Sequence, residues 1–199
     1  LLFQFILAQL LGTTTALQLL DLSRPDHPVM QYMLRNAPGS YQHSLQVANL
    51  AEQAAESIGA DVLLTRVGAI YHDIGKAANP QFFIENQVSG KSNPHDDLAP
   101  DISSAIIIKH VADGIQIAKK YHLPPRIIDF IKEHHGTLLT RYQYARAIQA
   151  SAGQIEQVNI EEYRYPGPSP RSRETALLML ADGCEARARA ELPRTDVEL

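Results

Sequence analysis

The sequence HDIGK, at residues 72–76, follows a segment that has the spacing of a buried helix. Asp61 is a favourable N-cap, and the apolar residues between it and Ile70 recur at helical intervals. We predict that this helix carries the histidine and the aspartate in its last turn and that the glycine ends it. Two strong metal-ligand types then lie side by side at the end of a buried helix, and Lys76 follows within reach of an anion.

Helical periodicity dominates the rest of the chain, and alternating strand patterns are scarce. Glycines and prolines separate segments of helical length, so the predicted fold class is all-α. The other predicted helices cover residues 29–35, 41–58, 100–121, 125–135, 138–150 and 176–189. Residues 76–100 lack this periodicity. A loop of this length inside a compact domain is typical of a lid or a ligand-binding loop, with a disordered connector as the alternative.

The composition fits one globular domain in a reducing compartment. The chain has 199 residues, of which 45% are hydrophobic, and this is enough to bury a core. Cys184 is the only cysteine, which excludes an internal disulfide and cysteine-rich zinc modules, so any metal must be held by histidines and carboxylates. The formal net charge of -4 argues against a DNA or RNA polymer as partner, because such binding requires neutralisation of many phosphates.

The N-terminal residues 1–22 are rich in leucine, but glutamines and threonines interrupt the apolar run. The run is therefore shorter than the ~20 residues needed to span a bilayer. The segment has neither an initiating methionine nor the pattern of a signal peptide. We interpret it as an amphipathic helix that packs on the domain, with a juxtamembrane connector as the alternative. Residues 23–199 form the predicted main domain.

Seven residues of metal-ligand type lie on apolar faces of the predicted helices or at helix ends beside them: His43, His72, Asp73, His110, His134, His135 and Asp182. A single histidine or aspartate in a core is more often a hydrogen-bonded structural residue than a ligand. Burial of all seven without compensating charge would cost several kcal/mol for each unpaired group, whereas divalent cations satisfy the whole set. The other three histidines lie in turns or beside prolines, and we interpret them as surface residues: His27, His95 and His122.

This ligand set indicates two metal ions. Imidazole and carboxylate without thiolate suit Fe, Mn, Zn, Ni or Co, and seven ligands exceed what one catalytic ion with open positions uses. A carboxylate can join two ions through its two oxygens and a neutral imidazole cannot, so one aspartate is the predicted bridge. Two ions at ~3.5–4 Å stabilise an in-line displacement at phosphorus, which makes phosphoester hydrolysis the leading chemistry.

The order of these residues, from His43 to Asp182, resembles the HD superfamily of metal-dependent phosphohydrolases. Further motifs are similar to the cytoplasmic domain of the bacterial seven-transmembrane-HD receptors, which hydrolyse cyclic di-AMP. The resemblance extends from about Thr14 to Arg189. Its motifs are APGSYQHS (37–44), RVGAIYHDIGK (66–76), FIENQ (83–87), EHHGT (133–137) and YRYPGP (163–168).

The resemblance implies an HD-domain helical fold that opens cyclic di-AMP to linear pApA, through a hydroxide activated by two divalent ions, Fe or Mn. Asp73 would bridge the ions, and Lys76, also catalytic, would help neutralise phosphate. The implied ligands are His43, His72, Asp73 and Asp182 for one ion, and Asp73, His110, His134 and His135 for the other. In such a receptor, membrane helices precede Leu1 and the domain lies at the cytoplasmic face of the bacterial inner membrane. The sequence is compatible with an oligomer.

One difference between this sequence and another branch of the superfamily bears on the choice of substrate. The cyclic di-GMP branch of the superfamily carries Gly-Tyr-Pro shortly after its paired histidines, and here Gly136 is followed by Thr-Leu-Leu. This favours the adenine dinucleotide. Two alternatives stay open: hydrolysis of another nucleotide, and a module that senses cyclic dinucleotides without hydrolysis. The residues predicted to contact the substrate are Lys76, Asn86, Gln87 and Arg187.

Overall fold

The structure, a computed structural model, describes residues 13–88, 90 and 92–190 and confirms the all-α fold class. Within these residues there is no strand, and an isolated bridge joins Leu139 and Arg164. The α-helices are α2 (Ala16–Leu22), α3 (Pro28–Asn36), α4 (Pro38–Ile58), α5 (Val62–Tyr71), α6 (Pro100–Lys120), α7 (Pro125–Glu133), α8 (Arg141–Ala150) and α9 (Arg173–Ala190). Short 3-10 helices lie between them: η1 (Ile74–Ala78), η2 (Pro80–Phe82), η3 (Ile84–Asn86), η4 (Ile155–Gln157) and η5 (Ile160–Tyr163).

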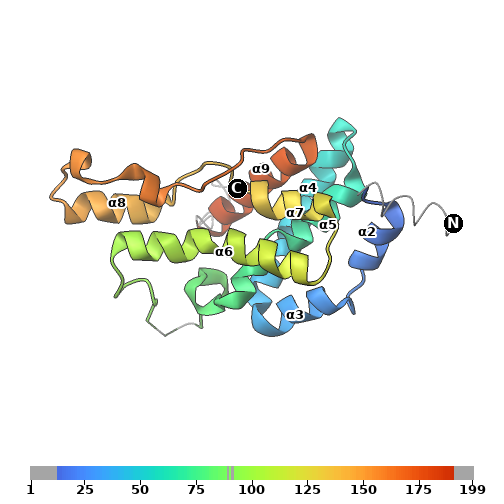
Figure 1. Cartoon of the computed structure of the whole chain (residues 1–199), viewed down its shortest axis with the longest axis horizontal. Coiled ribbons are helices and arrows are strands. Elements are labelled where there is room, and N and C mark those ends of the chain that lie inside the picture. Colours follow the sequence, from blue (N-terminus) through green and yellow to red (C-terminus); the bar gives the residue numbers. More distant parts are fainter. Residues whose placement is uncertain (1–12, 89, 91, 191–199) are drawn as a thin grey trace, which may run out of the picture.

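One hydrophobic core lies between α4, α5, α7 and α9 (Figure 1). Each helix contributes fully buried apolar side chains, such as Val47, Val67, Phe130 and Leu178. Burial of one such side chain stabilises the fold by about 1.5–3 kcal/mol. α6 packs on α7 and η1, and α8 lies alongside α6 and extends away from this core (Figure 1). The core thus fixes the helices that carry the seven predicted ligands.

The helix that carries the His-Asp pair ends earlier than predicted. α5 ends at Tyr71, His72 is its C-cap, and the chain continues into η1. The prediction that Gly75 ends this helix is therefore wrong. Gly75 lies inside η1 against α6, where an added Cβ atom would lie 1.8 Å from the carbonyl oxygen of His110. Glycine is required because two backbones approach closely at this point.

The described part of the loop at residues 76–100 packs against α6 and α8 through His95, which is 6% exposed. The His95 Nε2 atom donates a hydrogen bond to the carbonyl oxygen of Phe82, and its Nδ1 atom accepts one from Ser103 Oγ, each at 2.8 Å. Arg146 donates to the His95 carbonyl oxygen at 2.9 Å. The prediction that His95 is a surface residue is wrong, because its burial depends on helices remote in the sequence.

His122 is exposed, as predicted, whereas His27 is partly buried at the N-cap of α3. The His27 Nδ1 atom accepts a hydrogen bond from the backbone N–H of Val29 at 3.4 Å. Burial lowers the pKa of His27 below its ordinary value of 6.5. The unfolded chain therefore binds this proton more readily, and His27 costs stability as the pH falls below its unfolded pKa.

Replacement of His27 by asparagine should flatten this part of the pH dependence. Asparagine is a favourable N-cap and does not titrate, so H27N should keep most of the stability at neutral pH. Urea unfolding at several pH values from about 7 to about 5 should show a smaller loss of stability for H27N than for the wild type. Parallel losses in the two proteins would contradict the assignment.

The structure describes the N-terminal segment from residue 13 onward. In α2, Leu19 and Leu22 are buried in the core, while Leu17 and Leu20 are exposed. The predicted packing of residues 1–12 lies outside the described residues, and the division of the chain at residue 22 stays a prediction. No helix in the described ranges is long and apolar enough to cross a membrane.

Candidate metal centre

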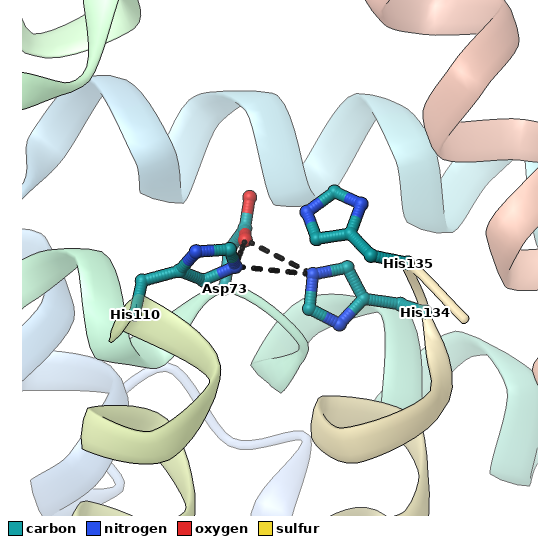
Figure 2. Close-up of side chains that lie close together, drawn as sticks. All are labelled: Asp73, His110, His134 and His135. Atoms are coloured by element: carbon teal, nitrogen blue, oxygen red, sulfur yellow. Dashed lines mark hydrogen bonds and ion pairs between the residues drawn. The ribbon is translucent and has the colours of Figure 1, made fainter. Parts of the chain in front are cut away.

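The structure brings the seven predicted ligands together in two groups. Within each group, one ligand atom from each residue lies within 4.8 Å of all the others. One group contains His43, His72 and Asp182, and the other, drawn in Figure 2, contains Asp73, His110, His134 and His135. They come from elements far apart in the chain. α4 carries His43, His72 and Asp73 lie between α5 and η1, and α6 carries His110. His134 and His135 follow α7, and α9 carries Asp182.

Asp73 lies between the two groups, and its side chain is 1% exposed. Its Oδ2 atom is 3.1 Å from His72 Nε2 and 3.5 Å from His43 Nε2. Its Oδ1 atom is 3.4 Å from His110 Nε2 and 3.6 Å from His134 Nε2. Each carboxylate oxygen therefore faces a different group, which is the geometry required of a carboxylate that joins two cations.

The imidazole rings are oriented for cation binding. The Nδ1 atoms of His72, His110 and His134 donate to the carbonyl oxygens three residues earlier, at 2.6, 2.6 and 2.9 Å. These bonds place the proton on Nδ1, so the Nε2 lone pairs point into the centre. His110 Nε2 and His134 Nε2 then face each other at 3.2 Å as two acceptors (Figure 2).

The chemistry of these atoms fits divalent cations. Within the described ranges, His72 Nε2 and both oxygens of Asp73 are buried without a hydrogen bond of normal geometry, although Asp73 Oδ2 has an ion-pair partner in Lys76 Nζ at 2.6 Å. Leaving buried polar atoms unpaired is costly, and a cation between the facing lone pairs would satisfy them together. The donor set of imidazole and carboxylate is one that divalent transition metals accept.

Electrostatics favours the protonation states that bind metals. Burial alone would raise the pKa of Asp73, but His72 and Lys76 hold the pKa of this carboxyl well below its usual range. Burial lowers the pKa of His134, and it lowers the pKa of His135 further. His72 is the exception: burial lowers its pKa, but Asp73, Asp182 and the Ala69 carbonyl together outweigh burial and raise the pKa overall. An ionised carboxylate and neutral imidazoles are the forms that coordinate a metal.

Lys76 is held between two carboxylates. Its Nζ atom is 2.6 Å from Asp73 Oδ2 and 2.9 Å from Glu85 Oε1, which also accepts a hydrogen bond from Ser40 Oγ at 2.9 Å. Burial lowers the pKa of Lys76, but the two carboxylates outweigh it and raise the pKa overall. Lys76 is therefore cationic and directly neutralises Asp73, and its predicted contact with phosphate stays a prediction.

Glu185 is a residue that sequence reasoning missed. It lies three residues after Asp182 on α9, is 8% exposed, and its Oε2 atom is 2.6 Å from His43 Nδ1. A carboxylate in this position can hold the ring so that its other nitrogen turns toward the metal centre. The spacing from Asp182 could have pointed to Glu185, because residues three apart share a helix face.

Glu185→Ala should weaken metal binding by roughly 10–100-fold, because His43 loses the carboxylate that orients it. Glu185→Gln keeps an oxygen near His43 Nδ1 and should restore part of the affinity. Competition of each variant with a chelator of known affinity measures the difference. Unchanged affinity in the alanine variant would show that Glu185 does not support the centre.

The other predicted substrate contacts have different surroundings. Both polar atoms of the Asn86 side chain bond to Ser40: Oδ1 accepts from its backbone N–H at 3.1 Å, and Nδ2 donates to its Oγ at 2.7 Å. Gln87 lines a cavity beside the centre, and Arg187 is exposed on α9. Tyr165 was not predicted as a site residue, although its motif was noted. Its ring centroid lies 4.2 Å from that of His135.

The model of the HD domain family matches residues 40–187, a range that includes all seven ligand-type residues, and the chain belongs to this family. Within this family, the chain is similar to the cyclic-di-AMP phosphodiesterases called PgpH. It is 45% identical over 179 residues to the cyclic-di-AMP phosphodiesterase PgpH of Bacillus subtilis (strain 168), a match that covers 90% of this chain and 24% of that protein. PgpH of Listeria monocytogenes serotype 1/2a (strain 10403S) is also 45% identical, over 184 residues.

Two solved structures of the L. monocytogenes PgpH HD domain are similar to most of this chain. One has a TM-score of 0.77 at 45% identity and covers 85% of this chain and 77% of that one. Another, in complex with cyclic di-AMP, has a TM-score of 0.81 at 44% identity and covers 88% of this chain and 80% of that one. This chain spans about a quarter of the length of the two PgpH proteins. Ribonuclease Y of Acholeplasma laidlawii (strain PG-8A) is 33% identical over 95 residues.

Proposed function

We propose that this chain hydrolyses cyclic di-AMP to linear pApA with the help of two divalent cations. The observation that carries the proposal is the position of Asp73, which turns one oxygen toward each of the two groups of ligand atoms. The relatives support the choice of substrate. B. subtilis PgpH is a cyclic-di-AMP phosphodiesterase, and the PgpH HD domain of L. monocytogenes is known in complex with cyclic di-AMP.

Two bound cations at ~3.5–4 Å would activate water and stabilise the oxygens of an in-line displacement at phosphorus. The residues of the chain prepare this chemistry. Asp73 fixes the relation between the two groups, and Lys76 keeps Asp73 ionised and adds positive charge beside it. His135 is the most exposed of the seven residues, with 22% of its side chain accessible, so substrate approaches on this side. The Tyr165 ring packs against His135 and forms part of the wall there.

We infer that the native cations are Fe or Mn. The donor set without thiolate supports this choice over metals that favour sulfur, and it combines the imidazoles that suit iron with carboxylates that suit manganese. Reconstitution of metal-free protein with single metals, followed by measurement of metal content and turnover, tests the inference. The highest turnover with Zn, Ni or Co at full occupancy would replace it.

A substrate panel tests the proposed reaction. Metal-loaded protein should convert cyclic di-AMP to pApA faster than it cleaves cyclic di-GMP, a guanosine alarmone or a mononucleotide, as followed by chromatography. Tight binding of cyclic di-AMP without release of pApA would identify a sensor instead. Faster cleavage of another nucleotide would reassign the substrate. A short RNA belongs in the panel because of the ribonuclease Y match, although the net charge of -4 argues against a polymer.

We further propose that this domain is the cytoplasmic part of a receptor in the bacterial inner membrane. In this arrangement residues 1–22 connect membrane-embedded segments before Leu1 to the catalytic domain at residues 23–199. The support is that the matched PgpH proteins are about four times as long as the matched region. Fractionation of cells that express the complete gene product tests this: recovery of the HD domain away from the membrane would contradict it.

A further inference from the structure

A cavity of about 440 Å³ lies beside the metal centre. Its size falls within the range of small-molecule pockets. Residues from the loop, from α6 and from α8 line it, among them Phe82, Gln87, Ile107, Tyr142 and Gln143. None of these residues belongs to either group of ligand atoms. The cavity is therefore a separate space that the chemistry at the metal centre does not explain.

Two of the lining residues contact His110 of the metal centre, and a third pairs with Lys76 beside it. The Phe83 ring centroid is 5.7 Å from that of His110, and Glu85 pairs with Lys76 at 2.9 Å. The carbonyl oxygen of Ile107 accepts the hydrogen bond that orients His110. The cavity thus begins one side chain away from the second group of ligand atoms. A substrate with a phosphate at the centre can place an adjoining group in this space.

Gln143 is the polar residue that the fold leaves unsatisfied in the cavity. Gln143 is 7% exposed, and neither polar atom of its side-chain amide has a hydrogen-bond partner in the parts of the chain described. Gln87, in contrast, donates to the Gln81 carbonyl oxygen and to Asn93 Oδ1, at 3.2 and 3.1 Å. The amide atoms of Gln143 are not among the fully buried unpaired atoms of the described residues, so they are accessible in the cavity. A ligand that offers one donor and one acceptor can pair with both.

Aromatic rings accompany this amide. Phe82 and Tyr142 both line the cavity, and Tyr142 is 65% exposed although it adjoins the buried Gln143 on α8. α8 lies alongside α6 and extends beyond the core (Figure 1), and Tyr142 and Gln143 in its first turn line the cavity together with residues of the loop. Exposed aromatic rings beside an apolar wall are surfaces on which nucleobases stack.

We propose that this cavity holds one adenine base of the substrate, with Gln143 hydrogen-bonded to the edge of the base; this inference rests on the proposed function. A glutamine amide pairs with adenine in two hydrogen bonds, because it accepts from the N6 amino group and donates to N7. Guanine presents two acceptors, O6 and N7, at the same edge. The Gln143 oxygen would face O6 without a proton between them. Gln143 therefore selects adenine over guanine.

Substitutions of Gln143 test the inference. Gln143→Leu keeps the size of the side chain and removes both hydrogen bonds, so the KM for cyclic di-AMP should rise roughly ten- to a hundredfold with kcat little changed. Gln143→Lys presents donors alone and should shift the ratio of kcat/KM for cyclic di-AMP over cyclic di-GMP toward the guanine dinucleotide. A variant that merely folds poorly would lower both activities and leave this ratio unchanged. Gln149→Ala, on the exposed side of the same helix, is the matched control and should behave as the wild type.

The outcomes separate this inference from the proposed function. A wild type that releases pApA, with Gln143 variants that keep the wild-type KM and the wild-type ratio, would overturn the inference and leave the proposed function intact. A wild type that loads metal but does not cleave cyclic di-AMP would overturn the proposed function. In that case, calorimetric titration of cyclic di-AMP into wild type and Gln143→Leu decides the base site by itself: equal affinities would overturn it.

Discussion

Asp73→Asn is expected to abolish the proposed hydrolysis of cyclic di-AMP, with a loss in kcat of roughly a thousandfold or more. Asp73 is the residue whose two oxygens face different groups, Oδ2 toward His72 and Oδ1 toward His110. An asparagine offers one oxygen and no charge, so it cannot hold two cations together. Electrostatic stabilisation by a metal is worth several kcal/mol in the transition state, and each 1.36 kcal/mol lost is tenfold in rate.

Metal analysis distinguishes this explanation from simple misfolding. The Asp73→Asn protein should keep its helical circular dichroism but hold fewer than two ions per chain, because the amide offers one neutral oxygen in place of two charged ones. Lys76 keeps Glu85 as a charged partner. Asp129→Asn is the matched control, since this aspartate pairs with Arg126 at 3.0 Å on α7 and 39% of its side chain is exposed. It should leave metal content and turnover unchanged. Full turnover of Asp73→Asn with two ions bound would refute the bridging role.

The seven ligand-type residues could be found from the sequence because each interrupts an apolar helical face or ends a helix. Such an interruption is local, so the pattern shows it even though the residues are far apart in the chain. His43, for example, lies one turn before the fully buried Val47 on α4. The pattern also placed the main helices, since their lengths follow from periodicity and from glycine and proline.

The supporting residues are harder to find in this way. The spacing of three residues from Asp182 is a local signal for Glu185, but Gln143 is a polar residue on a helix with exposed faces, and nothing in its own segment distinguishes it from a solvated side chain. Their burial depends on the packing of α9 against α4 and of α8 against α6. His95 was misassigned for the same reason, because Ser103 and Phe82 enclose it only after the loop folds back on α6. Tertiary contacts rather than local patterns decide such positions.

Two explanations of the glycine in the HDIGK sequence predict opposite effects when Gly75 is replaced by alanine. If its glycine served to end a helix or free the chain, alanine would cost little, because Gly75 is not among the described glycines with positive φ. The structure gives a different reason: an alanine Cβ would lie 1.8 Å from the His110 carbonyl oxygen and 2.5 Å from the Gly114 nitrogen. These are backbone atoms of α6, so the helix itself must move.

Gly75→Ala should therefore destabilise the protein by about 3 kcal/mol or more, at the upper end of the cost of overpacking. The displacement of α6 would also move His110 Nε2 away from Asp73 Oδ1, which lies 3.4 Å from it. The variant should therefore lose metal from the group that contains His110, even where the protein remains folded. Urea unfolding and metal content measure the two effects. Gly183→Ala is the control, because an added Cβ at this position in α9 meets nothing within 4 Å. Alanine there should stabilise the helix by about 0.5–1 kcal/mol, and a similar gain at Gly75 would contradict the close contact of η1 with α6.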